Sequence, residues 1–152
     1  MHFLIKNEKE IENLAEVFAK NIIPEFILLS GQLGAGKTTF TKYLAKSLKI
    51  QQNVNSPTFI IMNQYDLPNK NYQLIHIDAY RLTNESDDLE MFLEAFHNNL
   101  VIIEWYENID KIINFNNAVI LELKLVDDNI RDIKISGQGN LYNKIIKDLN
   151  NK

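Results

Sequence analysis

The sequence predicts a three-layer α/β fold, in which a mixed β-sheet with a parallel centre and antiparallel margins lies between two layers of helices. Three observations predict this fold. The apolar run at residues 26–29, and residues 100–104 with four apolar residues before Glu104, have the length of buried strands. Segments with helical periodicity alternate with strand-like runs, which is typical of parallel strand–helix–strand units. Two pairs of strand-like runs are separated by short polar turns, and such hairpins add antiparallel strands.

The first predicted elements are a short strand and a helix. Residues 2–6 should form the strand, and Asn7 with Glu10 forms a capping pattern at the start of the helix. Helical spacing places four apolar residues on one face, which should therefore be buried. These residues are Ile11, Leu14, Ala15 and Phe18.

The segment after the buried strand of residues 26–29 matches the pattern G-x-x-x-x-G-K-[ST] at Gly31, Gly36, Lys37 and Thr38. Gly31, Gly34 and Gly36 can take positive φ, so successive N–H groups can turn toward phosphate oxygens. A buried strand before the loop and an amphipathic helix after it are the context that this motif requires. The sequence therefore predicts a P-loop NTPase fold that binds a nucleoside triphosphate with Mg²⁺.

Three residues at the end of this loop have expected roles. Lys37 should place its ammonium on the β- and γ-phosphates, and the Thr38 hydroxyl should occupy one position of the Mg²⁺ ion. Thr39 offers a further backbone N–H, which should reach the α-phosphate. The dipole of the following helix adds to this attraction for anions.

The sequence pattern in the middle of the chain predicts a hairpin, a helix and a strand. Residues 58–65 and 72–77 are rich in β-branched and aromatic residues, with turn chemistry at residues 67–71 between them. Residues 86–96 should form a helix, followed by the buried strand of residues 100–104. The inward-facing residues of this helix are expected to be Leu89, Phe92, Leu93 and Phe96.

The C-terminal part predicts a second hairpin and a closing helix. The hairpin strands are residues 118–126 and 130–136, and the helix is residues 141–149. Because the chain has 152 residues, we expect one domain over residues 1–152.

Composition narrows the classes of function. Hydrophobic residues at 45% and charged residues at 24% are typical of a globular protein. A net charge of −4 argues against a broad basic face for nucleic acid, so any contact with RNA should run through a partner. We expect no membrane span and no signal peptide. The absence of cysteine excludes disulfides, and we expect a cytoplasmic protein.

Two carboxylates follow apolar runs, where open α/β sheets place their ligands. Asp78 follows residues 74–77, and Glu104 follows residues 101–103. A P-loop enzyme needs such an acid to hold Mg²⁺ and to orient the attacking water. The residues alone leave both acids as candidates for direct contact with the metal.

Two other features have less specific interpretations. His76 alternates with Ile75 and Ile77, and this pattern favours a structural histidine over a catalytic one. Ser56-Pro57-Thr58 is either a turn into the next strand or a switch segment whose threonine faces the γ-phosphate.

Four segments occur in the order and approximate spacing of the TsaE (YjeE) family, which the sequence resembles over most of its length. They are the phosphate loop at residues 31–39, Asn55-Ser56-Pro57-Thr58-Phe59, His76-Ile77-Asp78-Ala79-Tyr80-Arg81-Leu82 and Ile103-Glu104-Trp105. This family is the small bacterial ATPase required for threonylcarbamoyladenosine modification of tRNA.

The resemblance implies roles for individual residues. Thr38 and Glu104 would ligate Mg²⁺, and Asp78 would act in hydrolysis either by orienting water or by hydrogen-bonding to the ligands of the metal. Lys37, Asp78 and Glu104 are therefore the expected catalytic residues. Trp105 would lie beside the nucleotide, although ordinary packing of this single tryptophan is an equal alternative. The residues implied to bind the triphosphate are Gly31, Gly34, Ala35, Gly36, Lys37, Thr38, Thr39 and, on the late hairpin, Arg131.

The resemblance also implies partners. The chain would bind ATP and Mg²⁺, dock on the TsaD–TsaB pair, and reset that complex by slow hydrolysis, reaching tRNA only through these proteins. One alternative is a small-molecule or nucleoside kinase, although two arginines provide little for an arginine-bearing lid. Another alternative is a binding module that senses ATP without hydrolysing it.

Overall fold

The computed structural model describes residues 1–52 and 61–151. These residues form one seven-stranded sheet with helices on both faces. The strands are β1 (His2–Ile5), β2 (Phe26–Ser30), β3 (Met62–Asp66), β4 (Gln73–Asp78), β5 (Leu100–Glu104), β6 (Ala118–Asp127) and β7 (Ile130–Gln138). The α-helices are α1 (Glu8–Asn21), α2 (Lys37–Ser47), α3 (Leu89–Phe96) and α4 (Asn140–Asn150), and the 3₁₀ helices are η1 (Tyr106–Ile112) and η2 (Phe115–Asn117).

The strand order is β1-β7-β6-β2-β5-β4-β3. The central pairs β6–β2, β2–β5 and β5–β4 are parallel. The outer pairs β1–β7, β7–β6 and β4–β3 are antiparallel. This arrangement confirms the predicted mixed sheet, and it leaves the carboxyl ends of β2, β4 and β5 at one edge.

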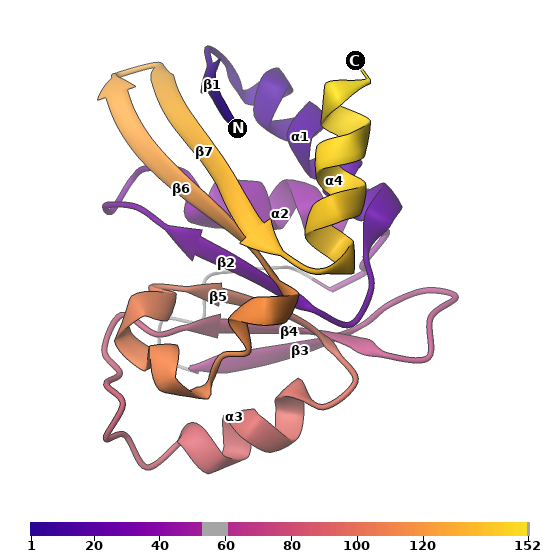
Figure 1. Cartoon of the computed structure of the whole chain (residues 1–152), viewed down its shortest axis with the longest axis vertical. Helices are drawn as coiled ribbons and strands as arrows, with labels where there is room; N and C mark the ends of the chain where they lie inside the picture. The colour runs from indigo at the N-terminus through magenta and orange to yellow at the C-terminus, as the bar shows by residue number, and fades with distance from the viewer. Residues whose placement is uncertain (53–60, 152) are drawn as a thin grey trace.

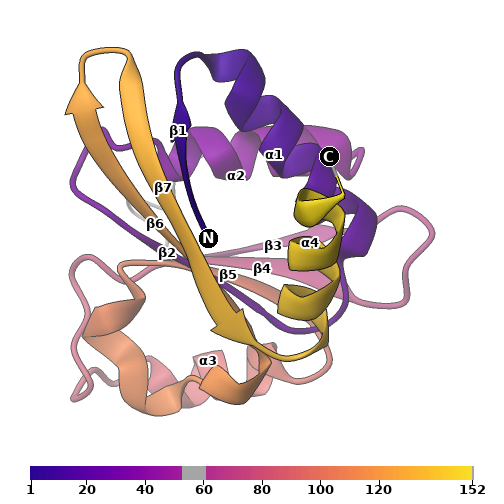
Figure 2. The same ribbon diagram turned by 45° about the horizontal axis from the view of Figure 1, so that its top comes forward.

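Two layers of helices cover the sheet, with α1, α2 and α4 on one face and α3 with η1 on the other (Figures 1 and 2). Successive side chains of β2 point to opposite faces of the sheet, so this strand packs against both helix layers. Ile27 and Leu29 belong to the core cluster that contains Phe18 of α1 and Phe40 of α2. Leu28 instead packs in the cluster that contains Phe92 of α3. The sheet is therefore buried on both faces, as its central parallel strands require.

The start of α1 follows the predicted capping pattern with one difference. The Asn7 side chain accepts a hydrogen bond from the Glu10 backbone N–H at 3.0 Å. The Glu10 carboxylate accepts from the Lys6 backbone N–H at 2.6 Å, whereas a capping box would use the N–H of the cap residue itself. Glu10 thus ties the helix to the end of the preceding strand.

The prediction for α3 was wrong at its start and on one face. Hydrogen bonds between Thr83 and Ser86 hold a turn, with the Thr83 N–H donating to the Ser86 hydroxyl at 2.9 Å, so the helix begins only at Leu89. Leu93, predicted to face inward, has half of its surface exposed. The buried face instead follows Phe92, with Leu89 and Phe96 packed beside it.

Other predictions differ in extent or lie outside the described ranges. Sequence periodicity did not predict the 3₁₀ helices η1 and η2. Ser56-Pro57-Thr58 and the first part of the strand predicted at residues 58–65 fall within residues 53–60, which are outside the described ranges. Within the ranges that are described, no helix has the length and hydropathy needed to cross a membrane.

Candidate functional site

The loop between β2 and α2 adopts the backbone conformation that its glycines permit. Gly31, Gly34 and Gly36 have φ of 146°, 81° and 108°. A Cβ on Gly31 would lie 2.3 Å from the Leu123 carbonyl oxygen of β6, so a side chain has no room there. The loop therefore packs its backbone directly on the sheet and ends at the N-terminus of α2, where the first N–H groups of a helix have no partner within the helix and can donate to an anion.

Arg131 contacts this loop from the far hairpin. Its Nε donates to the Ala35 carbonyl oxygen at 2.9 Å, and a Cβ on Gly36 would lie 3.2 Å from the same nitrogen. Strand β7 thus positions a guanidinium at the rim of the loop, 96 residues away in sequence. The remaining nitrogens of Arg131 carry positive charge to the edge of the site.

Lys37 is the first residue of α2 and is 6% exposed. Its ammonium donates to the carbonyl oxygens of Gly31 and Gln32, the latter at 3.1 Å, and Nζ lies 4.7 Å from the centroid of the Trp105 ring. Burial lowers the pKa of Lys37, and the carboxylates of Glu104, Asp78 and Glu107 oppose this shift. The ammonium is thus held beside the loop among acidic groups.

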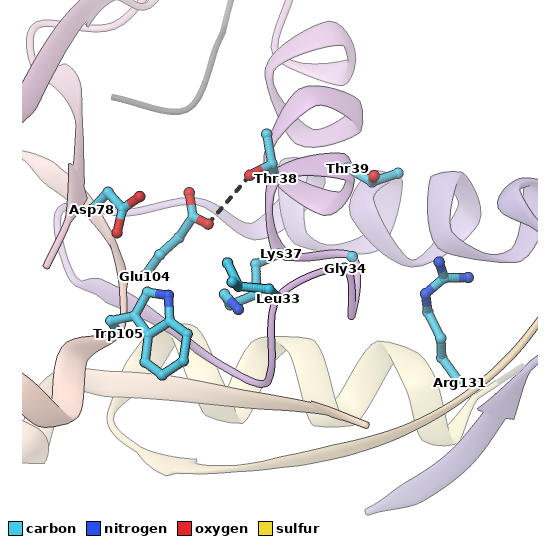
Figure 3. A pocket seen from close by; sticks show the side chains of 10 residues that line it. Leu33, Gly34, Lys37, Thr38, Thr39, Asp78, Glu104, Trp105 and Arg131 are labelled. Atoms are coloured by element: carbon cyan, nitrogen blue, oxygen red, sulfur yellow. Dashed lines mark hydrogen bonds between the residues drawn. The ribbon is translucent and has the colours of Figure 1, made fainter. Parts of the chain in front are cut away.

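The two predicted acids are direct neighbours in the sheet. Asp78 is opposite Glu104 in the register of β4 and β5, so both side chains leave the sheet on the face covered by α2. Glu104 is 3% exposed and its Oε1 accepts from the Thr38 hydroxyl at 3.3 Å. The Asp78 carboxylate accepts from the Tyr80 backbone N–H at 3.0 Å. Figure 3 shows both acids beside the start of α2, with Glu104 nearer to Thr38.

These groups surround a cavity of about 200 Å³ (Figure 3). Its lining combines loop residues, the two acids, the tryptophan and the arginine. It consists of Leu33, Gly34, Gly36, Lys37, Thr38, Thr39, Asp78, Glu104, Trp105 and Arg131. Gly31 and Ala35, which were also predicted to bind nucleotide, are not among these lining residues, and Ala35 is 1% exposed. The structure therefore brings the predicted residues of four separate segments around one cavity.

Comparison with known proteins identifies the family. The family described as "Threonylcarbamoyl adenosine biosynthesis protein TsaE" matches residues 5–133. The chain belongs to the TsaE family. It is therefore a member of a family involved in tRNA threonylcarbamoyladenosine biosynthesis.

Individual TsaE proteins match over nearly the whole chain. The chain is 37% identical to the tRNA threonylcarbamoyladenosine biosynthesis protein TsaE of Rickettsia typhi, over 93% of this chain and 98% of that protein. It is 39% identical to the Bacillus subtilis protein of the same name, over 93% and 86%. The crystal structure of Bacillus subtilis YdiB superposes with a TM-score of 0.79 at 28% identity, covering 99% of this chain and 94% of that one. The P-loop fold predicted from the sequence is thereby confirmed.

Two features of this TsaE site were not predicted from the sequence. His76 Nε2 lies 2.7 Å from Glu104 Oε2, so the predicted structural histidine contacts a site residue. Glu107, on η1, accepts from the hydroxyl of Ser30 at 3.1 Å and adds a carboxylate near Lys37. A periodic pattern could have placed His76 on the same strand face as Asp78, but no pattern in the sequence indicates the position of Glu107.

Trp105 packs against a neighbouring ring, as one of its two predicted alternatives has it, and it also lines the cavity. The residue has φ of 58°, and its backbone N–H donates to the Leu29 carbonyl at 3.2 Å. Its ring packs on Tyr80, with centroids 5.1 Å apart, and also lines the cavity. Packing therefore fixes the indole at a position from which it can contact a ligand.

The donor set suits a magnesium ion. A threonine hydroxyl and a carboxylate oxygen lie side by side at Thr38 and Glu104, and Mg²⁺ prefers oxygen ligands. In residues 1–52 and 61–151, no group of three or more His, Cys, Asp or Glu side chains is arranged to hold a metal. A site of this kind suits Mg²⁺, which is usually bound by one or two protein ligands together with substrate phosphates and waters.

Proposed function

We propose that this TsaE family member is an ATPase that binds ATP with Mg²⁺ and acts as a subunit of the tRNA modification pathway. In this proposal it docks on a TsaD–TsaB pair and uses hydrolysis to reset that complex between rounds of threonylcarbamoyl transfer to the adenosine next to the anticodon. The observation that carries the proposal is the Thr38 hydroxyl against the Glu104 carboxylate, beside the buried Lys37.

The loop would bind the triphosphate through its backbone. The amides of residues 34–39 and the N-terminus of α2 would donate to the phosphate oxygens. The Lys37 ammonium would exchange its two carbonyl partners, Gly31 and Gln32, for the β- and γ-phosphates. A phosphate oxygen carries more negative charge than a carbonyl oxygen, so this exchange favours nucleotide binding.

Thr38 and Glu104 would hold the Mg²⁺ ion, which when bound neutralises charge that develops on the phosphates. Asp78 lines the same cavity opposite Glu104 and would orient a water molecule toward the γ-phosphorus. The attack forms a bond from the water oxygen to phosphorus and breaks the bond to the bridging oxygen, which leaves with ADP. The proton of the water passes to phosphate or to solvent.

Slow intrinsic turnover is expected because the arginine at the site has another task. Arg131 donates its Nε to Ala35, and it is the only arginine among the described lining residues. An arginine finger supplied by a partner can accelerate phosphoryl transfer by 10³–10⁵-fold. We therefore expect the TsaD–TsaB pair to complete the site.

Phosphate release measured with and without the two partners tests this proposal. The chain alone should release phosphate from ATP slowly and only with Mg²⁺, and adding TsaD and TsaB together should raise the rate at least ~10-fold. Equal rates with and without the partners would contradict partner activation.

Incubation with γ-labelled ATP separates the ATPase from its alternatives. An ATPase should transfer the label to water alone, so stable label on a small acceptor would favour the kinase. Full modification of tRNA with a non-hydrolysable ATP analogue would favour a binding module that does not hydrolyse ATP.

A further inference from the structure

We propose that His76 is a positioning residue that holds the Glu104 carboxylate in the orientation from which it binds Mg²⁺ beside Thr38. This inference rests on the proposed binding of ATP with Mg²⁺. It assigns a task to a buried histidine that the proposed mechanism does not otherwise use.

The contact between the two side chains follows from the sheet. His76 of β4 is opposite Ile102 of β5, and Glu104 lies two residues further along β5 on the same face. Such diagonal neighbours on adjacent strands are within reach of long side chains. The distance from His76 Nε2 to Glu104 Oε2 is 2.7 Å. Both residues belong to strands that are paired on both sides, so the sheet register sets the relative position of their side chains.

Burial makes this hydrogen bond necessary. His76 is 0% exposed and Glu104 is 3% exposed, so water cannot solvate the carboxylate freely. A buried carboxylate is costly unless hydrogen bonds compensate the loss of water. The two oxygens of Glu104 have separate partners, with Oε2 at His76 and Oε1 at the Thr38 hydroxyl. His76 thus fixes one oxygen and thereby aims the other at Thr38.

The unpaired ring nitrogen indicates which way this hydrogen bond runs. Within the described ranges, His76 Nδ1 is buried and has no hydrogen-bond partner. A ring with a proton on Nδ1 would bury an unpaired donor, which folded proteins avoid more strictly than an unpaired acceptor. Placing the proton on Nε2 and leaving Nδ1 as an acceptor avoids this cost, so His76 donates to the Glu104 carboxylate. Carboxylate ligands of metals are commonly held by hydrogen bonds of this kind.

Without this donor, Glu104 has another attractive partner. The Lys37 ammonium interacts electrostatically with Glu104. A carboxylate released from His76 could rotate toward that charge and away from Thr38. Removing such a supporting hydrogen bond typically weakens metal affinity by about 10–100-fold.

Calorimetric titration of ADP in EDTA and in Mg²⁺ tests the role of His76 without relying on turnover. His76→Leu should keep the affinity for ADP in EDTA and weaken the apparent affinity for Mg²⁺ in the presence of ADP by about 10–100-fold. His76→Gln should retain most of the Mg²⁺ affinity, because its amide nitrogen can occupy the place of Nε2. His76→Asn, whose amide is too short, should behave like His76→Leu. His97→Leu, at an exposed histidine after α3, is the matched control.

A double variant tests whether the two residues act together. Adding His76→Leu to Glu104→Gln should weaken Mg²⁺ affinity no further than Glu104→Gln alone. If His76→Leu does not fold, the comparison of the Gln and Asn variants carries the same test.

Two outcomes would overturn the inference, and a third would contradict the proposed function on which it rests. Wild-type Mg²⁺ affinity in both His76→Leu and His76→Asn would overturn the role of His76 and leave the proposed function standing. An equal loss of ADP affinity in EDTA and in Mg²⁺ would do the same, because it indicates a merely structural role. A wild-type protein whose ADP binding does not respond to Mg²⁺ would instead contradict the proposed function itself.

Discussion

Lys37 shows how one buried side chain is prepared for a ligand. Its ammonium is almost enclosed, donates to two loop carbonyls and lies against the Trp105 ring. Burial lowers its pKa, which means that the charge is incompletely stabilised in the protein alone. Phosphate groups would add charge-assisted hydrogen bonds to this buried ammonium, so nucleotide binding should draw much of its energy from Lys37.

Replacing Lys37 tests this argument. Lys37→Ala should weaken nucleotide binding by about 100-fold or more, since it removes charge-assisted hydrogen bonds worth roughly 3 kcal/mol. Lys42→Ala, at an exposed lysine of the same helix, should bind nucleotide like the wild type. Calorimetric titration with ADP and Mg²⁺ measures both, and an unchanged affinity in Lys37→Ala would contradict its role.

The partly buried phenol of Tyr106 should make the free energy of unfolding depend on pH in the alkaline range. Burial raises the pKa of its phenol from 10.0 to about 12, with Glu107 and Glu122 adding to the shift. Because the folded pKa is raised, the neutral phenol stabilises the fold fully below pH 10, and this contribution is lost as pH rises to about 12. The free energy of unfolding of the wild type should therefore fall more steeply over this range than that of Tyr106→Phe. Urea titrations at several pH values measure both slopes, and parallel curves would contradict the assignment.

At the scale of elements, the unit formed by β2, the loop and α2 depends on two kinds of glycine. Gly31 combines positive φ with backbone contact to Leu123, so a side chain would displace β6. Gly34 has φ of 81° but open space around its Cα. The first glycine is needed for packing, and the second only for the conformation of the loop.

Alanine substitutions should separate these roles. Gly34→Ala should cost roughly 1–2 kcal/mol of unfolding free energy, which is the penalty for a left-handed residue with a side chain. Gly31→Ala should cost about 3 kcal/mol or more because overpacking against β6 adds to the strain. Urea unfolding measures both, and a Gly31→Ala protein as stable as Gly34→Ala would show that the loop does not pack on β6 as described.

The elements that the sequence predicted well are those whose signal is local. The strands at residues 26–29 and 100–104 each contain four consecutive apolar residues between polar segments, and such a run is the local signal of a buried strand. The helix α3 was mispredicted because apolar residues at Leu89, Phe92, Leu93 and Phe96 fit a wider face than the sheet actually covers. The helix η1 has no periodic pattern, so the sequence alone does not indicate where Glu107 lies.

At the scale of the whole molecule, the sheet order decides which residues meet. The loop motif predicted most of the cavity lining locally, whereas the register of β4, β5 and β2 sets where Asp78 and Glu104 lie relative to the loop. The contacts of Arg131 and His76 join segments that are distant in sequence, so only tertiary structure reveals what they bind. The prediction of one domain over residues 1–152 stays a prediction.

The central claim is that the backbone of residues 31–39, with Lys37 and an ion held at Thr38 and Glu104, binds the phosphates of ATP. A crystal structure with a non-hydrolysable ATP analogue and Mg²⁺ tests this claim most directly. We predict triphosphate density across the amides of residues 34–39, the Lys37 ammonium turned from its carbonyl partners to phosphate, and an ion between Thr38 and Glu104. Nucleotide density elsewhere on the molecule, with the loop unchanged, would contradict the account.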